Sequence, residues 1–279
     1  MILRRLFRNR IGCAGLFLVG SVILAGLLAP LVSPYDPYAI DMDIALTPPG
    51  PAHPLGTDFF GRDILSRLLL GARITLLVSL VARGIAVVAG TLLGLAAGYF
   101  GGRADSAIMR LADVTLAYPG LLLLIAVMAA VGPSLYSLIF TIGVVGWAGV
   151  ARLVRSQVLS LKEREFVEAI RSLGGSPFNI IFRHLLPNCS SQLIVIFSMG
   201  LGTAVMAESS MSFLGLGAQP PLPSWGSMIS SGLDYLRVAP WLSIAPGAAI
   251  TLVVLGFNLL GDALRDILDP ILSGSDRRR

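Results

Sequence analysis

Charged residues are scarce in this sequence. Asp, Glu, Lys and Arg together make up 13% of its 279 residues, whereas about 25% is usual in soluble domains. Hydrophobic residues make up 55%, and the mean hydropathy is +0.81. A chain of this length could bury a soluble core, but its apolar residues stand in long blocks rather than in alternating or amphipathic patterns. The composition therefore excludes an ordinary soluble domain.

Cysteine and histidine are also rare, with two of each. Cys13 and Cys189 fall near the face that the charge distribution below marks as cytoplasmic, so we expect no disulfide and assign both as packing residues. Two cysteines supply too few ligands for a metal site. His53 and His184 lie in separate loops. We therefore expect neither a metal site nor catalytic chemistry, and no cofactor bound by this chain.

Lysine occurs once, at Lys162. The phosphate-binding loop GxxxxGK[ST] needs glycines whose backbone N–H groups surround the phosphates ahead of the lysine. No such glycines precede Lys162. If the activity of this protein is driven by ATP, the ATP must be hydrolysed by another chain.

The sequence contains long apolar runs with few charged residues in them. Crossing a bilayer takes about 20 mostly apolar residues. Six segments qualify: 11–32, 74–98, 114–131, 135–154, 190–214 and 240–261. The sequence therefore predicts an all-α integral membrane protein with six transmembrane helices. We expect the first to be retained, because it is longer than the apolar core of a signal peptide.

Basic residues are divided unequally between the two sides that these spans define. The outer segments contain only Arg62, Arg67, Arg73 and Arg237. The inner segments contain sixteen: Arg4, Arg5, Arg8, Arg10, Arg103, Arg110, Arg152, Arg155, Lys162, Arg164, Arg171, Arg183, Arg265, Arg277, Arg278 and Arg279. Cytoplasmic loops are rich in Lys and Arg, so the termini, residues 1–10 and 262–279, are predicted to be cytoplasmic. This distribution explains the net charge of +5 without nucleic acid.

The outer segment 33–73 changes character halfway along. Its first half is rich in Pro and Asp and is expected to be irregular. In the second half, Thr57 or Asp58 could cap a helix. At helical spacing, the apolar residues of this half fall on one face and the polar residues on the other. The apolar face holds Ile64, Leu65, Leu68 and Leu69, and the polar face holds Arg62, Asp63, Ser66 and Arg67. The pattern predicts an amphipathic helix at the outer interface, ahead of a core of five predicted spans over 74–261.

Three glycines in the second span recur every fourth residue, at Gly90, Gly94 and Gly98. This spacing places them on one helical face, where the lack of side chains lets another helix approach closely. The pattern predicts tight helix packing and carries no information on a substrate.

A polar stretch of about 35 residues separates the fourth and fifth spans, and we place a hairpin at 156–188 within it. Apolar residues recur at i, i+3, i+4 and i+7 in two sets, Phe166, Ala169, Ile170 and Leu173, then Phe178, Ile181, Phe182 and Leu185. Gly174 and Gly175 end the first set, and Ser176 with Pro177 suits the start of a second helix. Pro187 would end or kink that helix. The pattern predicts a hairpin of two short helices, either a docking element or a passive connector.

Glu168-Ala169-Ile170, then Gly174, then Leu186-Pro187 resembles the EAA coupling motif of ABC importer permeases. This sequence departs from the family's EAA pattern at two positions, Ile170 and His184. Four further stretches are similar, in the same order, to the peptide/nickel permease family and its dipeptide-type C subunits: HPLGTDFFGRDILSRLLLGAR, FRHLLPN, SFLGLGAQPPLPSWG and FNLLGDALRDILDP.

This resemblance implies a type I ABC importer permease of the MetI-like fold in a bacterial inner membrane. It implies a second, homologous permease subunit, two cytoplasmic ATPase subunits that bind ATP and Mg²⁺, and an external substrate-binding protein. The substrate would be a di- or oligopeptide, with nickel or a metal chelate as the alternative. The residues that would couple to an ATPase are Phe166, Glu168, Ala169, Ile170, Leu173, Gly174, Leu186 and Pro187.

Two charged residues fall well inside predicted spans, whereas Arg152 lies at the inner end of 135–154. Arg83 lies near the middle of the second span, and Glu208 lies toward the outer end of the fifth. Such residues are costly in a bilayer and usually face the bundle interior. Each could line a translocation path or serve only the packing of helices. A stand-alone channel or proton-coupled carrier would also fit six spans, but it should carry a filter-like segment or a chain of carboxylates.

Overall fold

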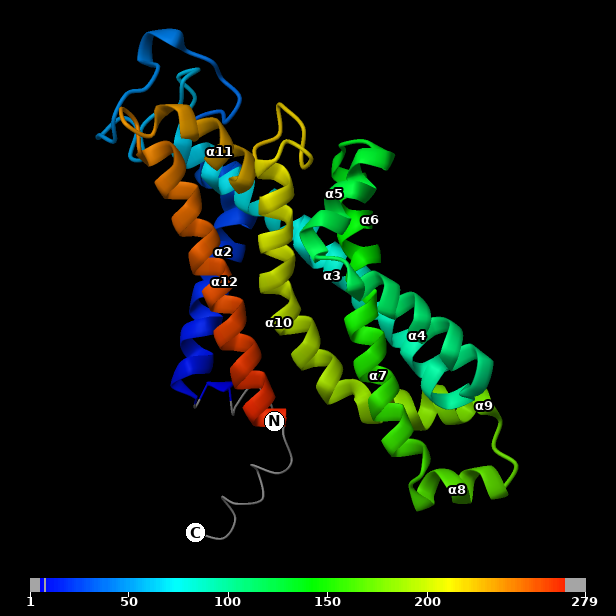
Figure 1. The fold of residues 1–279 in the computed structure, drawn as a ribbon. Coiled ribbons are helices and arrows are strands. Elements are labelled where there is room, and N and C mark those ends of the chain that lie inside the picture. Colours follow the sequence, from blue (N-terminus) through cyan, green and yellow to red (C-terminus); the bar gives the residue numbers. More distant parts are fainter. Residues whose placement is uncertain (1–5, 8, 269–279) are drawn as a thin grey trace.

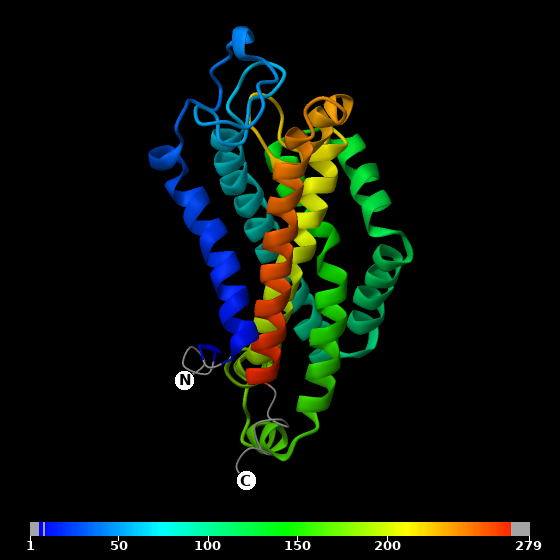
Figure 2. The same ribbon diagram turned by 90° about the vertical axis from the view of Figure 1, so that its left-hand side faces the viewer.

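The computed structural model describes residues 6, 7 and 9–268, and these residues form helices joined by loops (Figure 1, Figure 2). No strand occurs among them, apart from one isolated antiparallel bridge between Thr57 and Asp63. The predicted all-α class is confirmed. Part of the predicted tail 262–279, from residue 269 onward, lies outside the described residues.

Five helical segments are long and apolar enough to cross a membrane. They are α2 (Arg10–Val32), α3 (Ile64–Phe100), α6 with α7 (Leu135–Val145 and Trp147–Lys162), the segment Pro177–Phe213, and α12 (Trp241–Leu268). Three short elements lie outside these segments, in the parts of the chain predicted to be outer. They are α11 (Trp225–Gly232) and the 3₁₀ turns η1 (Met42–Ile44) and η3 (Leu233–Tyr235).

The predicted third span, 114–131, is not one straight helix. It is divided between α4 (Gly102–Ala117) and α5 (Gly120–Val131), which meet at an angle of 97°. Tyr118 takes an extended conformation and Pro119 caps α5. The break has a local cause, because proline disfavours helical geometry in the residue before it and suits a helix start. If α4 and α5 together cross the membrane, they form a sixth span that is broken in the middle.

The amphipathic outer helix that the sequence predicts is not a separate element. α3 runs without interruption from Ile64 into the second span, and its cap is Asp63, whose Oδ2 accepts a 2.8 Å hydrogen bond from the Ser66 N–H. The predicted caps Thr57 and Asp58 lie in the preceding loop. The supposed polar face is also buried, since Ser66 is 0% and Arg67 8% exposed. The outer loop covers that face.

Two tryptophans fix the outer segments, one against α3 and the other against the loop before it. Trp225 of α11 is 1% exposed, and its Nε1 donates a 3.0 Å hydrogen bond to the Leu68 carbonyl. Trp241 begins α12 and donates to the Thr57 carbonyl at 3.3 Å. Because both anchors come from segments more than 150 residues away, the outer end is a single assembled cap.

The glycine face of α3 packs on α7, as predicted. A Cβ added at Gly90 would lie 2.6 Å from the Val150 Cβ, and one at Gly94 would lie 2.6 Å from the Ala151 carbonyl oxygen. Gly98 lies equally close to Val158. Real Cβ atoms do not approach other heavy atoms so closely, so these positions require glycine for the observed helix separation.

Candidate functional site

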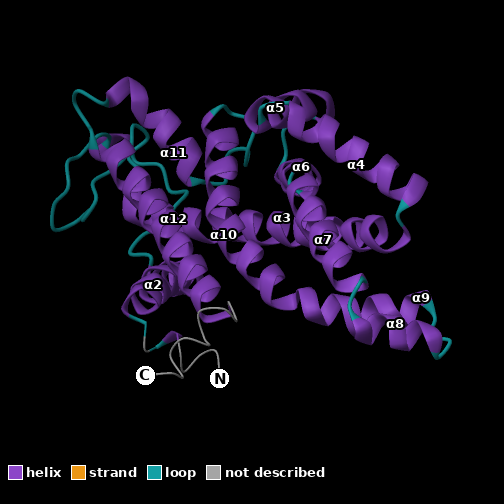
Figure 3. Cartoon of the chain, turned by 60° about the horizontal axis from the view of Figure 1, so that its bottom comes forward, coloured by secondary structure: helices purple, strands orange, loops and turns teal. Residues whose placement is uncertain are grey.

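The hairpin predicted between the fourth and fifth spans is present and projects from one end of the molecule (Figure 1, Figure 3). We use the name "hairpin" for residues 163–185. Its first arm is α8 (Glu165–Ser172) and its second begins with α9 (Pro177–Asn179). The flanking parts of the predicted range 156–188 belong to α7 and α10 (Leu186–Phe213).

The elbow between the arms is built from the residues that the sequence singled out. Gly174 has φ +81°, in the left-handed region that favours glycine. The Gly175 N–H donates to the Ile170 carbonyl at 3.0 Å. Ser176 caps the second arm, accepting a 3.3 Å hydrogen bond from the Asn179 N–H, and Pro177 follows it at the first position. The geometry is therefore that of a capped, defined turn.

The second arm does not end at Pro187, which was one of the two outcomes predicted there. After α9 the chain forms a π-helical segment, η2 (Ile180–Leu185), and continues directly into α10. The Leu186 N–H donates to the Ile181 carbonyl five residues back. Pro187, which has no N–H to donate, then sits in the first turn of α10. The arm is thus continuous with a membrane span, and a movement of the hairpin moves the base of α10.

One buried residue, Val167, attaches α8 to the rest of the molecule. It is 0% exposed and belongs to an apolar cluster with Val158, Leu161 and Ile180. The sequence analysis missed it, because Val167 lies outside the i, i+3, i+4, i+7 pattern of α8. The spacing of Val158, Leu161 and Val167 across the α7–α8 turn gives no helical period that could have revealed it.

The apolar pattern of α8 faces outward instead. Phe166 is 38% and Leu173 88% exposed, Ala169 and Glu168 are also exposed, and only Ile170 is half-buried. Leu186 is half-buried and Pro187 exposed at the start of α10, away from α8 along the chain. Exposed leucine and phenylalanine on a projecting element are typical of an interaction surface.

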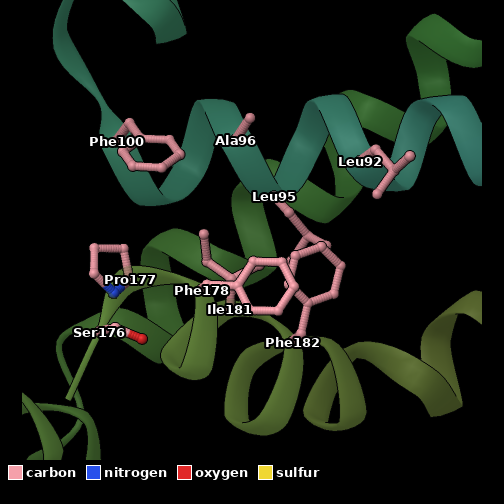
Figure 4. Close-up of a pocket in the computed structure, with 9 residues that line it drawn as sticks. All are labelled: Leu92, Leu95, Ala96, Phe100, Ser176, Pro177, Phe178, Ile181 and Phe182. Atoms are coloured by element: carbon pink, nitrogen blue, oxygen red, sulfur yellow. The ribbon is translucent and has the colours of Figure 1, made fainter.

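An apolar groove of about 520 Å³ lies between the second arm and the end of α3 (Figure 4). Phe178 and Phe182 of the arm face Leu92 and Phe100 of α3 across it (Figure 4). Phe178 is 71% exposed and Phe182 39%. The remaining lining residues are Leu95, Ala96, Ser176, Pro177 and Ile181.

The two membrane-embedded charges occupy different surroundings. Arg83, on α3, lines a cavity of about 180 Å³ and donates a 2.6 Å hydrogen bond from Nη2 to the Ile196 carbonyl of α10. Glu208, on α10, is 0% exposed and does not line that cavity. Its Oε1 accepts a 2.8 Å hydrogen bond from Ser212, and its Oε2 a 3.3 Å bond from Ser209. The carboxylate is satisfied within its own helix.

No group of three or more His, Cys, Asp or Glu side chains suited to a metal ion occurs in the described part of the chain. His53 instead hydrogen-bonds Asp63 at 2.9 Å in the outer cap.

Residues 90–274 match the family described as the inner membrane component of binding-protein-dependent transport systems. The chain belongs to this family. Residues 1–49 match the N-terminal transmembrane domain of oligopeptide transport permease C. Together the two matches confirm the ABC importer permease resemblance, and the protein is a multi-pass membrane protein of this kind.

Curated relatives are similar over almost their full length. The dipeptide transport system permease protein DppC of Alkalihalophilus pseudofirmus is 43% identical over 96% of this chain and 88% of its own. The glutathione transport system permease protein GsiD of Pectobacterium atrosepticum is 44% identical over 96% and 90%. The oligopeptide transport system permease protein OppC of Bacillus subtilis is 38% identical over 95% and 87%. A permease of this family works with an ATPase and a binding protein, and is not itself an enzyme.

Proposed function

We propose that this permease imports di- or oligopeptides, and that an ATPase subunit binds its hairpin. The three relatives described above are named for dipeptides, glutathione and oligopeptides, and none of the three is named for nickel. With a homologous second permease it forms one translocation path. Two ATPase subunits bind ATP and Mg²⁺, and an external binding protein delivers the peptide.

The exposure of Leu173 at the tip of α8 is the observation that carries the docking proposal. An 88% exposed leucine at one end of α8 and exposed Phe166 near the other are unfavourable in water, and covering them would release that cost. Glu168 on the same short helix supplies a charged contact at the rim. The capped elbow at Gly174 gives the surface a fixed shape, so a pull on α8 reaches α10 through the continuous second arm.

The docking surface also supports an orientation of the chain in the membrane, with both termini on the cytoplasmic side. α2 begins and α12 ends at the same end of the molecule as the hairpin (Figure 1, Figure 2). Because ATP is cytoplasmic, an ATPase on the hairpin places both chain termini on the cytoplasmic side of the inner membrane, in agreement with the distribution of Lys and Arg.

Leu173→Asp tests the docking surface. Fully burying a leucine side chain contributes about 1.5–3 kcal/mol, and a carboxylate in its place adds a desolvation cost. We expect ATPase recovered with the purified permease complex to fall at least about tenfold. Val238→Asp is the matched control, because Val238 is 67% exposed at the outer end. Equal recovery of the ATPase with both variants would refute docking through α8.

A further inference from the structure

The cavity beside Arg83 lies halfway along α3, among four elements. Its walls are mostly small residues, which is what leaves it open: Ala82, Ala86, Gly120, Gly146, Gly200, Ala204 and Ala207. Leu124, Ile142, Val145 and Thr203 complete the lining with Arg83. At about 180 Å³ it is smaller than the usual 300–1,000 Å³ ligand pocket and suits one chemical group rather than a whole peptide.

The Arg83 side chain is held in this cavity but not satisfied there. Nη2 donates to the Ile196 carbonyl, while the buried Nε has no hydrogen-bond partner in the described part of the chain. The guanidinium lies against Gly200, where an added Cβ would be only 1.9 Å from Nε. Arginine stays protonated in proteins, so a positive charge lines the cavity.

A helix N-terminus meets the same cavity. Gly120, the first residue of α5, is one of its lining residues, and no side chain caps α5 because its cap is Pro119. The first N–H groups of a helix are unpaired and carry a partial positive charge. Broken membrane helices place such half-helix N-termini at anionic groups of their substrates. The 97° break between α4 and α5 creates this terminus, and Gly120 itself is exposed.

No acidic side chain balances these two positive features among the lining residues. Glu208 is the nearest acidic candidate along α10, but it is fully buried outside the lining and accepts hydrogen bonds from Ser212 and Ser209. The lining therefore carries one positive side chain and no carboxylate, which favours an anionic group such as a carboxylate.

We propose that Arg83 and the N-terminus of α5 bind the terminal carboxylate of the peptide as it crosses the membrane. The inference rests on the proposed function, peptide import. A terminal carboxylate is common to dipeptides, oligopeptides and glutathione, whereas their side chains differ. A site for this group would hold many peptides without selecting among their sequences.

Arg83→Gln and Arg83→Lys test the site in the complete importer, reconstituted in vesicles with its ATPases and binding protein. The readout is peptide transported per ATP hydrolysed. Gln keeps a donor for the Ile196 carbonyl but removes the charge, so we expect the ratio to fall about tenfold or more in Arg83→Gln. Lys keeps the charge, so we expect a much smaller fall in Arg83→Lys. A wild-type ratio in Arg83→Gln would overturn the proposal. Failure of the wild type to import peptide would refute the proposed function instead.

Thr203→Glu and Thr203→Gln test the cavity without altering Arg83. Thr203 lines it from α10, and a glutamate there would pair with the guanidinium in place of the substrate. We expect Glu to abolish import and the isosteric Gln to retain most of it. Equal import by the two variants would contradict an anion site.

A C-terminally amidated dipeptide shows whether Arg83 binds the substrate carboxylate or another anion, such as a lipid phosphate. The ratio of free to amidated dipeptide uptake is measured for the wild type and Arg83→Gln with the same binding protein, whose own preference then cancels. We expect the ratio to fall in the variant, because only the free peptide loses a partner. An unchanged ratio would mean that Arg83 serves another group, and would overturn the proposal.

Discussion

At the scale of single residues, two charges that look alike in the sequence have different surroundings in the fold. Arg83 and Glu208 are both isolated ionisable residues in apolar segments, and periodicity places neither relative to a cavity. Only the packing of α3, α5, α6 and α10 shows that Arg83 borders an open space while Glu208 is enclosed. Their roles depend on contacts between segments far apart in the chain, which a single sequence does not contain.

Glu208→Gln should therefore leave transport by the assembled complex within about twofold of the wild type. Gln keeps an acceptor for Ser212, so little is lost. Glu208→Leu removes every acceptor and should lower the free energy of unfolding by about 1–3 kcal/mol. Uptake normalised to assembled complex is the measurement. A strong loss of uptake in a normally assembled Glu208→Gln complex would show that this carboxylate does line the path.

Gly94→Ala should destabilise the protein although alanine is the better helix former. The added Cβ would lie 2.6 Å from the Ala151 carbonyl oxygen, and overpacking costs about 1–3 kcal/mol. Gly84→Ala, on the same helix, has nothing within 4 Å and should gain up to about 1 kcal/mol. Unfolding of both variants in denaturing detergent compares them, and a Gly94→Ala variant as stable as Gly84→Ala would contradict the observed packing.

At the scale of elements, local signals predicted well and tertiary contacts did not. The turn at Gly174, the cap at Ser176 and the glycine face of α3 all follow from a few neighbouring residues. The outer helix was misjudged because Ser66 and Arg67 were taken as a solvent-facing side, whereas the loop before them covers both. Pro119 was a visible signal for the break in the third span, but apolar length alone outweighed it.

Two ion pairs join α4 to α7, and they should differ in strength. Asp105 and Arg155 are 18% and 31% exposed and share two hydrogen bonds, one of them 2.6 Å between Oδ2 and Nη2. Asp113 and Arg152 form the other pair and are 64% and 53% exposed. Asp105→Asn should lower the free energy of unfolding by about 1 kcal/mol and Asp113→Asn by less than about 0.5 kcal/mol. The reverse order in a detergent unfolding titration would show that α4 is held differently.

At the scale of the whole molecule, the fold connects the exposed surface of the hairpin to the open pocket beside Arg83. The hairpin continues into α10, and α10 carries the Ile196 carbonyl, Gly200 and Thr203 beside Arg83. A pull on the hairpin by a closing ATPase would tilt α10 and change the cavity without any flexible joint between them. A stand-alone carrier has no need of such a connection.

Purification of the intact complex from native membranes under gentle conditions, with identification of every chain recovered, tests the central claim most directly. The account predicts that a second, homologous permease and ATPase subunits accompany this chain, and that vesicles containing it without the ATPases do not accumulate peptide. Recovery of a homogeneous assembly of this chain alone, still able to transport, would contradict the account and establish a stand-alone carrier.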